Sequence, residues 1–182
     1  GSGSSWANFG GITVSLANLF NQLLITNGGT VVSVGTSTIG SNAGANSNLV
    51  MVTGTGSLWT NSGVIQVGNQ AAFNTVMIAN SGTVVSAGVG IGGAYATAVG
   101  NLALVTGSGS TWSNTGTLTV GNSGQSNLLV VVDGARFVGA SSFIVGSAAG
   151  ASNNLVAVSG TNTLWTSGGV TCYLGLNGSW NQ

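Results

Sequence analysis

The sequence predicts an all-β protein, a right-handed parallel β-helix (β-solenoid) of about seven coils with 26 or 27 residues each. Three observations lead to this prediction. Short sequence motifs repeat every 53 residues, and asparagines recur at about half of that spacing. Short runs rich in Val, Ile and Thr alternate with turns rich in Gly and Asn. Coils stacked in register make parallel strands, whose crossover connections are right-handed. We expect a single domain over residues 1–182.

The 53-residue double-coil repeat is clearest around the tryptophans. The text reads GSGSSW at 1–6, GTGSLW at 54–59, GSGSTW at 107–112 and GTNTLW at 160–165, so the opening GSGS belongs to the repeat. These motifs define the Trp column of Trp6, Trp59, Trp112 and Trp165. With one valine between successive tryptophans, the expected alternation is Trp6, Val32, Trp59, Val85, Trp112, Val138, Trp165.

The Trp column has two interpretations. Trp can fill wide corners of the core, alternating with Val to fit the volume. Trp can also form an exposed row that stacks on sugar rings, because alternate coils lie about 9.6 Å apart, close to the disaccharide repeat of a β-linked glycan. We favour core packing or burial in an interface.

A second column consists of asparagines at steps of 26 or 27 residues, each followed by an apolar run. Stacked amides at strand spacing can hydrogen-bond along the stack. We therefore expect a structural Asn ladder rather than a polar row that binds a ligand. After Asn154, a step of 26 residues leads to Trp180. The ladder residues are Asn21, Asn48, Asn74, Asn101, Asn127 and Asn154.

The apolar run after each Asn predicts an apolar outer surface. Alternate residues of a strand face opposite ways, so if Val50 and Val52 point inward, Met51 points outward. Its equivalents in other coils are apolar too, and a contiguous exposed apolar stripe marks an interface. The expected lateral interface consists of Leu24, Met51, Met77, Leu104 and Val130.

Composition excludes several function classes. Asp133 and Arg136 are the only charged side chains, and there is no His. Acid–base or nucleophilic catalysis lacks its titratable groups, so we expect no enzyme, no catalytic residues, no metal site and no cofactor. One Arg cannot neutralise a run of phosphates, which excludes nucleic acid. The apolar runs are far shorter than the roughly 20 residues of a membrane-spanning helix.

Three local expectations follow. Asp133 takes the turn position of Asn27 and Asn80, and it pairs with Arg136 across that turn. Cys172, in a strand-like run from Val170 to Leu174, is expected to be a small buried hydrophobe. Both ends of the stack expose unpaired strand edges, which invite another chain. Since residue 1 is not Met, we expect these residues to be a mature or excised part of a longer precursor.

Two coils carry a resemblance to a known family: NLVMVTGTGSLWTNSGVIQVG at 48–68 and NLALVTGSGSTWSNTGTLTVGNSG at 101–124. They resemble the repeats of bacterial autotransporter-type passenger proteins, the family shared by type V secretion and PEP-CTERM-associated proteins. The resemblance covers essentially the whole chain. It implies a secreted right-handed β-helix at the cell surface, often in adhesins or matrix proteins.

The leading functional hypothesis is a structural subunit of a self-assembling bacterial extracellular filament, sheath or surface layer. Low charge removes repulsion between copies, so the expected partner is the chain itself, head to tail and laterally. The alternative is an autotransporter-like adhesin passenger that binds surface glycans or host or cell surfaces, which needs an exposed Trp column. Ice binding would need outward Thr pairs on every coil, and none run through all seven.

Overall fold

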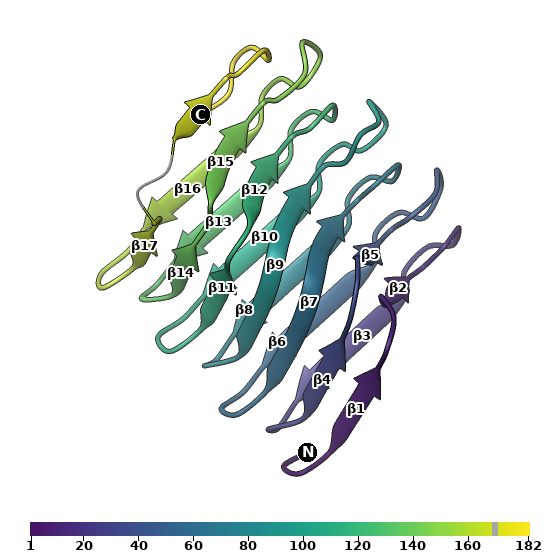
Figure 1. Ribbon diagram of the computed structural model, residues 1–182, viewed down its shortest axis with the longest axis vertical. Helices are drawn as coiled ribbons and strands as arrows, with labels where there is room; N and C mark the ends of the chain where they lie inside the picture. Colours follow the sequence, from purple (N-terminus) through teal and green to yellow (C-terminus); the bar gives the residue numbers. More distant parts are fainter. Residues whose placement is uncertain (169–170) are drawn as a thin grey trace.

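The computed structural model describes residues 1–168 and 171–182, and throughout this part the regular elements are β-strands. The strands pair in parallel with the coils before and after them, which confirms the predicted parallel β-solenoid. Figure 1 shows the coils stacked from the N-terminal end to the C-terminal end. The stack has about six complete turns, close to the predicted number, because six strands pair in one sheet and the main path of the other sheet has seven.

The six-stranded sheet holds the apolar run that follows each ladder asparagine. Its strands pair without a break in the order β16-β13-β10-β8-β6-β3. Register is kept throughout: Met51 pairs with Leu24 on one side and with Met77 on the other. The strands are β3 (Gln22–Thr26), β6 (Leu49–Thr53), β8 (Thr75–Ala79), β10 (Leu102–Thr106), β13 (Leu128–Val132) and β16 (Leu155–Ser159).

The second sheet faces the first and has two rows of strands. The Trp row consists of β1 (Ser5–Asn8), β4 (Thr30–Ser33), β7 (Leu58–Val67), β9 (Thr83–Ile91), β11 (Thr111–Asn114), β14 (Arg136–Gly139) and β17 (Leu164–Thr166). The second row of this sheet, called the last row, follows the Trp row along the chain in each coil, and β7 and β9 are long enough to belong to both rows. Its other strands are β2 (Thr13–Val14), β5 (Ser37–Ile39), β12 (Thr117–Val120), β15 (Ser142–Val145) and β18 (Cys172–Leu174).

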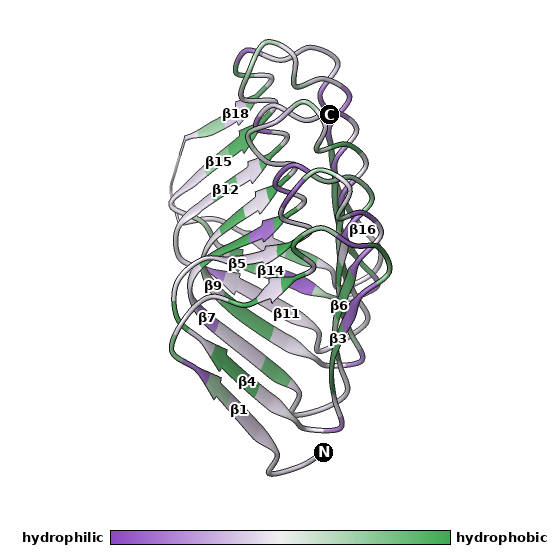
Figure 2. Cartoon of the chain, turned by 90° about the vertical axis from the view of Figure 1, so that its right-hand side faces the viewer, coloured by the Kyte–Doolittle hydropathy of each residue, from purple (hydrophilic) through white to green (hydrophobic). Residues whose placement is uncertain are grey.

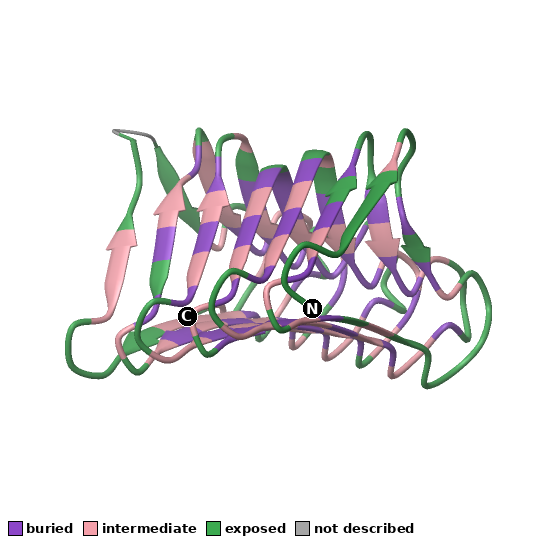
Figure 3. Cartoon of the chain, turned by 90° about the horizontal axis from the view of Figure 1, so that it is seen from below, coloured by how far each residue is buried: buried purple, intermediate pink, exposed green. Residues whose placement is uncertain are grey.

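The core lies between the two sheets and runs along the whole stack. Buried and partly exposed residues alternate along the strands, as Figure 3 shows for the central coils. In β6, Val50 and Val52 are fully buried, whereas Leu49 and Met51 are partly exposed. Burying an aliphatic side chain contributes roughly 1.5–3 kcal/mol, so the repetition of this pattern supplies the main stabilisation.

The predicted Trp–Val alternation was wrong by one residue at its valines. The structure pairs Trp59 with Val31 and Val84, and it pairs Trp112 with Val84 and Phe137. The cause is an alternation in turn length: residues 54–57 join β6 to β7, but only residues 80–82 join β8 to β9. Val32, Val85 and Val138 therefore face outward, beside the column rather than in it.

The shorter turns contain the one acidic residue of the chain. Asn27, Asn80 and Asp133 adopt left-handed φ values of 54°, 49° and 57°, so Asp133 occupies the turn position of the two asparagines, as predicted. The predicted ion pair with Arg136 is absent from the described part of the chain. Instead Asp133 Oδ2 accepts a hydrogen bond of 3.2 Å from Thr106 Oγ1 in the preceding coil. Asn80 bonds to the equivalent threonine with the direction reversed, because its Nδ2 donates to Thr53 Oγ1.

Candidate functional site

The Asn ladder is a continuous hydrogen-bonded stack next to the six-stranded sheet. Asn101 Oδ1 accepts two hydrogen bonds from Asn74, one from the backbone N–H at 2.9 Å and one from Nδ2 at 3.2 Å. The same pair of bonds joins Asn101 to Asn127 and each other neighbouring pair of the ladder. From Asn48 to Asn154 the residues are buried, so this part of the ladder is not accessible to a ligand.

The ladder continues beyond the six predicted residues. Asn154 donates from its backbone N–H and from Nδ2 to Asn181 Oδ1, both at 3.0 Å. The prediction that Trp180 takes this position was wrong, because the last coil is one residue longer than the other Trp coils. Trp180 instead occupies the corner before the ladder, with φ 58°, as do Phe20 and Phe73.

A column of glycines makes room for the ladder. Gly40, Gly68, Gly92, Gly121 and Gly146 end the last row of strands, and all have φ between 69° and 74°. A Cβ at any of them would collide with the side chain of a ladder asparagine. Backbone and amide therefore pack in direct contact, which requires glycine at this corner of these five coils, while the first coil has Ser15 there, also with a left-handed φ of 68°.

The central members of the Trp column lie in the core. Trp59 and Trp112 are both 0% exposed, whereas Trp6 at the first coil is 47% exposed and Trp165 is partly buried. Trp59 Nε1 donates to Ser33 Oγ at 3.0 Å, and Trp112 Nε1 donates to Ser86 Oγ at the same distance. These two indoles have no surface left to stack on a sugar ring.

A second buried polar stack, which was not predicted from the sequence, runs two residues after the Trp column. Asn61 Oδ1 accepts hydrogen bonds from Ser33 Oγ at 2.7 Å and Ser37 Oγ at 3.0 Å. Ser86 Oγ donates to Asn114 Oδ1 at 3.2 Å. The signal was the alternation of Trp-x-Asn with Val-x-Ser in successive coils, which pairs a large and a small residue at both positions.

The C-terminal coils replace this alternation with stacked aromatic rings. Phe137 takes the place of Val and stacks on Trp165, with ring centroids 4.7 Å apart and an interplanar angle of 23°. Phe143 also contacts Trp165, at 5.2 Å. Gly139 takes the position of the buried serine, pairing with Asn114. Aromatic side chains in neighbouring coils are thus compatible with the spacing of this solenoid.

The predicted lateral residues form one column on the outer face of the six-stranded sheet. Leu24, Met51, Met77, Leu104 and Val130 pair in consecutive strands. Leu24 is 54% exposed, and the other four are partly exposed. Figure 2 shows this sheet from its edge, with hydrophobic segments along β3, β6 and β16.

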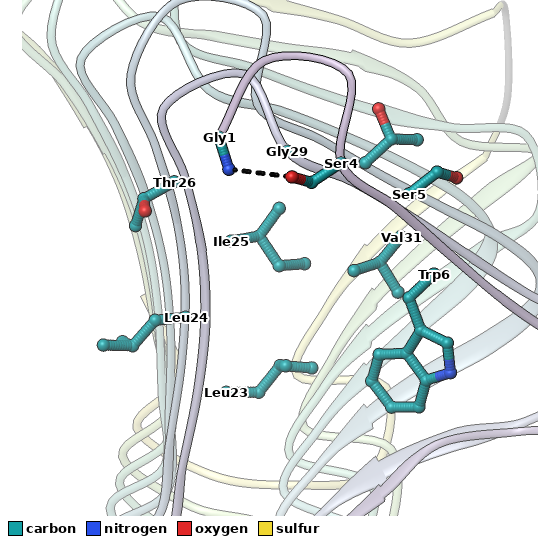
Figure 4. Close-up of a pocket in the computed structure, with 11 residues that line it drawn as sticks. Gly1, Ser4, Ser5, Trp6, Leu23, Leu24, Ile25, Thr26, Gly29 and Val31 are labelled. Carbon is teal, nitrogen blue, oxygen red and sulfur yellow. Dashed lines mark hydrogen bonds between the residues drawn. The ribbon is translucent and has the colours of Figure 1, made fainter.

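The N-terminal end of the stack opens into a cavity of about 290 Å³. Figure 4 shows Leu23, Ile25, Val31 and Trp6 pointing into it, while Leu24 points away to the outer face. A second cavity of about 300 Å³ shares Trp6 and Leu23. The walls are the inward faces of the first described strands, so the cavities are formed by core residues of the first described coil.

The C-terminal end also exposes side chains at inward positions. Val158 pairs with the buried Val131 but is 45% exposed, and Leu174 pairs with the buried Val145 but is 63% exposed. Cys172 is exposed in β18, so the prediction of a buried cysteine was wrong, because among the described strands β18 pairs with β15 alone. Val170, part of that predicted strand, lies outside the described residues.

Comparison with known proteins gives no neighbour from which a function could be transferred. No family model, no curated protein and no solved structure matches the chain. Within the described residues, no helix is long and apolar enough to cross a membrane. Functional inference therefore depends on the surfaces described above.

Proposed function

We propose that the chain is a structural subunit of a self-assembling bacterial extracellular filament, sheath or surface layer. The observation that carries this proposal is the chemistry of the two ends. Each exposes inward-facing apolar side chains, Trp6 and Leu23 at one end and Val158 and Leu174 at the other. Unpaired strands at both ends favour the addition of a further chain. The extracellular bacterial setting rests on the resemblance of the repeat text to autotransporter-type passengers.

The polarity of the Asn ladder supports stacking from head to tail. Within the described residues, Asn21 Oδ1 accepts no hydrogen bond, and the backbone N–H of Asn181 donates none. One end thus offers an acceptor and the other a donor at the same corner of the coil. A contact between two different surfaces repeats without closing, which produces a filament.

Low charge makes this association favourable. The chain has one Lys or Arg and one Asp or Glu, so copies do not repel one another. The hydrophobic effect can then act at the ends and on the apolar lateral face without an electrostatic cost. A contact of this kind suits a permanent assembly more than a free monomer.

Electron microscopy of the purified chain across a concentration series tests the proposal. Seven levels of strands about 4.8 Å apart, as in the main path of the second sheet, give an axial repeat of about 34 Å. We expect long unbranched filaments with this repeat above a critical concentration. Dispersed single rods at all concentrations would reject self-assembly.

A second candidate function is an adhesin passenger that binds glycans. The buried Trp59 and Trp112 do not support it, but another set of aromatic residues does. Phe20, Phe73 and Trp180 occupy the same left-handed corner position, and all three are exposed. The Phe73 ring lies against Gly100 of the next coil, where a Cβ would be 2.7 Å from the ring. Glycan-array binding that is lost in Phe73→Ala would favour this function.

A further inference from the structure

The outer face of the six-stranded sheet has a middle column that is apolar along its whole length, whereas its last column includes Thr26, Thr53, Thr106 and Ser159. Each strand has three outward positions, and none of these positions holds a charged residue. The middle column runs from Leu24 through Met77 to Ala157. The first outward column adds four leucines: Leu49, Leu102, Leu128 and Leu155.

The outer face of the other sheet is of a different kind. Its outward positions are rich in hydroxyl side chains, and Arg136 is one of them. Outward threonines and serines occur in both of its rows: Thr30, Thr60, Thr83, Thr111, Ser113, Thr13, Thr38, Thr117 and Thr119. The molecule therefore has one face with a continuous apolar column and one face that is richer in hydroxyl groups, where Val32, Val85 and Val138 are interspersed among them.

We propose that a second copy of this chain covers the apolar face with its own apolar face, so that filaments associate in pairs. This inference rests on the proposed function. The contact is isologous: the same patch is used on both sides, and a two-fold axis closes it. Once two apolar columns are joined, the faces that point outward have no continuous apolar column, because hydroxyl side chains interrupt their valines. Lateral growth then stops at two filaments instead of continuing into a sheet.

The size of the face sets the order of assembly. Six strands about 4.8 Å apart and five residues at about 3.3 Å cover about 480 Å². A stable interface buries about 800 Å² on each partner. One chain therefore lacks the area for a stable lateral dimer, whereas two or more stacked chains reach it. Elongation precedes pairing, and pairing stabilises the filament.

Charge complementarity also favours a second copy over a charged partner. The face offers no charge to an oppositely charged surface, and two copies bring no like charges together. The flexible side chains of Met51 and Met77 lie at its centre and can adapt to an identical surface.

Mass per unit length of the filaments tests the inference. For wild type, we expect two chains per axial rise of about 34 Å. The double variant Met51→Lys, Met77→Lys should still elongate but contain one chain per rise, because its lysines repel across the pair. Val85→Lys is the matched control on the opposite sheet, where Val85 is also outward and partly exposed, and it should keep two chains per rise.

Three results would overturn the inference while leaving the filament itself in place: wild-type filaments with one chain per rise, broad sheets with more than two, or a double variant that still pairs. Wild-type chains that never elongate would reject the proposed function as well. The wild-type measurement decides the stoichiometry even where a lysine variant fails to fold.

Discussion

The indole nitrogen of Trp59 donates a 3.0 Å hydrogen bond to Ser33 Oγ in the coil before it, and both side chains are buried. Ser33 in turn donates to Asn61 Oδ1 at 2.7 Å. The Ser33 hydroxyl accepts one hydrogen bond and donates another, and it thus joins its own coil to the coil that contains Trp59 and Asn61. Buried groups satisfied in this way fix the register of stacked coils.

Ser33→Ala should destabilise the protein by about 1–3 kcal/mol, because it leaves Trp59 Nε1 without an acceptor and removes one donor to Asn61. Denaturant unfolding followed by Trp fluorescence measures the change. Ser113→Ala, at an outward and partly exposed position, is the control and should be close to neutral. Equal effects of the two substitutions would show that the buried hydrogen bond adds nothing.

Asn101→Ala should cost more, about 3 kcal/mol, because it removes the acceptor of two buried donors of Asn74 and takes from Asn127 Oδ1 the Nδ2 donor, leaving it only the backbone N–H of residue 101. Asn21→Ala at the exposed end of the ladder should cost less, since Asn21 accepts no ladder bond. Urea midpoints of the two variants give the comparison. A loss at Asn21 as large as at Asn101 would contradict the role of burial.

Gly92→Ala should be far more destabilising than Gly3→Ala. Both glycines have left-handed φ, 74° and 78°, so the backbone strain is similar. A Cβ at Gly92 collides with Asn127 in the ladder, whereas a Cβ at Gly3 meets nothing within 4 Å. We expect about 1 kcal/mol for Gly3→Ala from strain alone and several times that for Gly92→Ala. Thermal unfolding of both variants checks the difference, and similar losses would rule out the contact.

Leu174→Lys should stop filament growth at the C-terminal end. Leu174 lies at an inward position of the last coil, so a lysine there puts a charge into the proposed joint. The critical concentration, measured by sedimentation, should rise at least tenfold. Leu176→Lys, on the following loop, is the control and should leave it unchanged. Normal filament growth of the Leu174 variant would show that the C-terminal end does not form the assembly contact.

The sequence predicted the parts of the fold that repeat at a constant period. Asn48 and its equivalents fall at steps of 26 or 27 residues because each must reach the amide of its neighbour, so the column is visible in the text. Strand register in the six-stranded sheet follows directly, as the pairing of Met51 with Met77 shows.

Features that vary between coils were not predictable in this way. The turn 54–57 is one residue longer than the turn 80–82, and this shifted the Val column by one position. The last coil has one extra residue, so the expected step of 26 residues led to Trp180 instead of the true ladder residue Asn181. A count of residues does not show which loop holds an insertion, because loops accept length changes at little energetic cost.

The ladder also gives the molecule a direction. In every pair, the asparagine nearer the N-terminus donates and the one nearer the C-terminus accepts, from Asn21 to Asn181. The amide dipoles therefore add instead of cancelling. A filament built by continuing this stack has two chemically distinct tips, so subunits should attach to them at different rates. Time-lapse imaging of seeded filaments should reveal one fast-growing tip and one slow one.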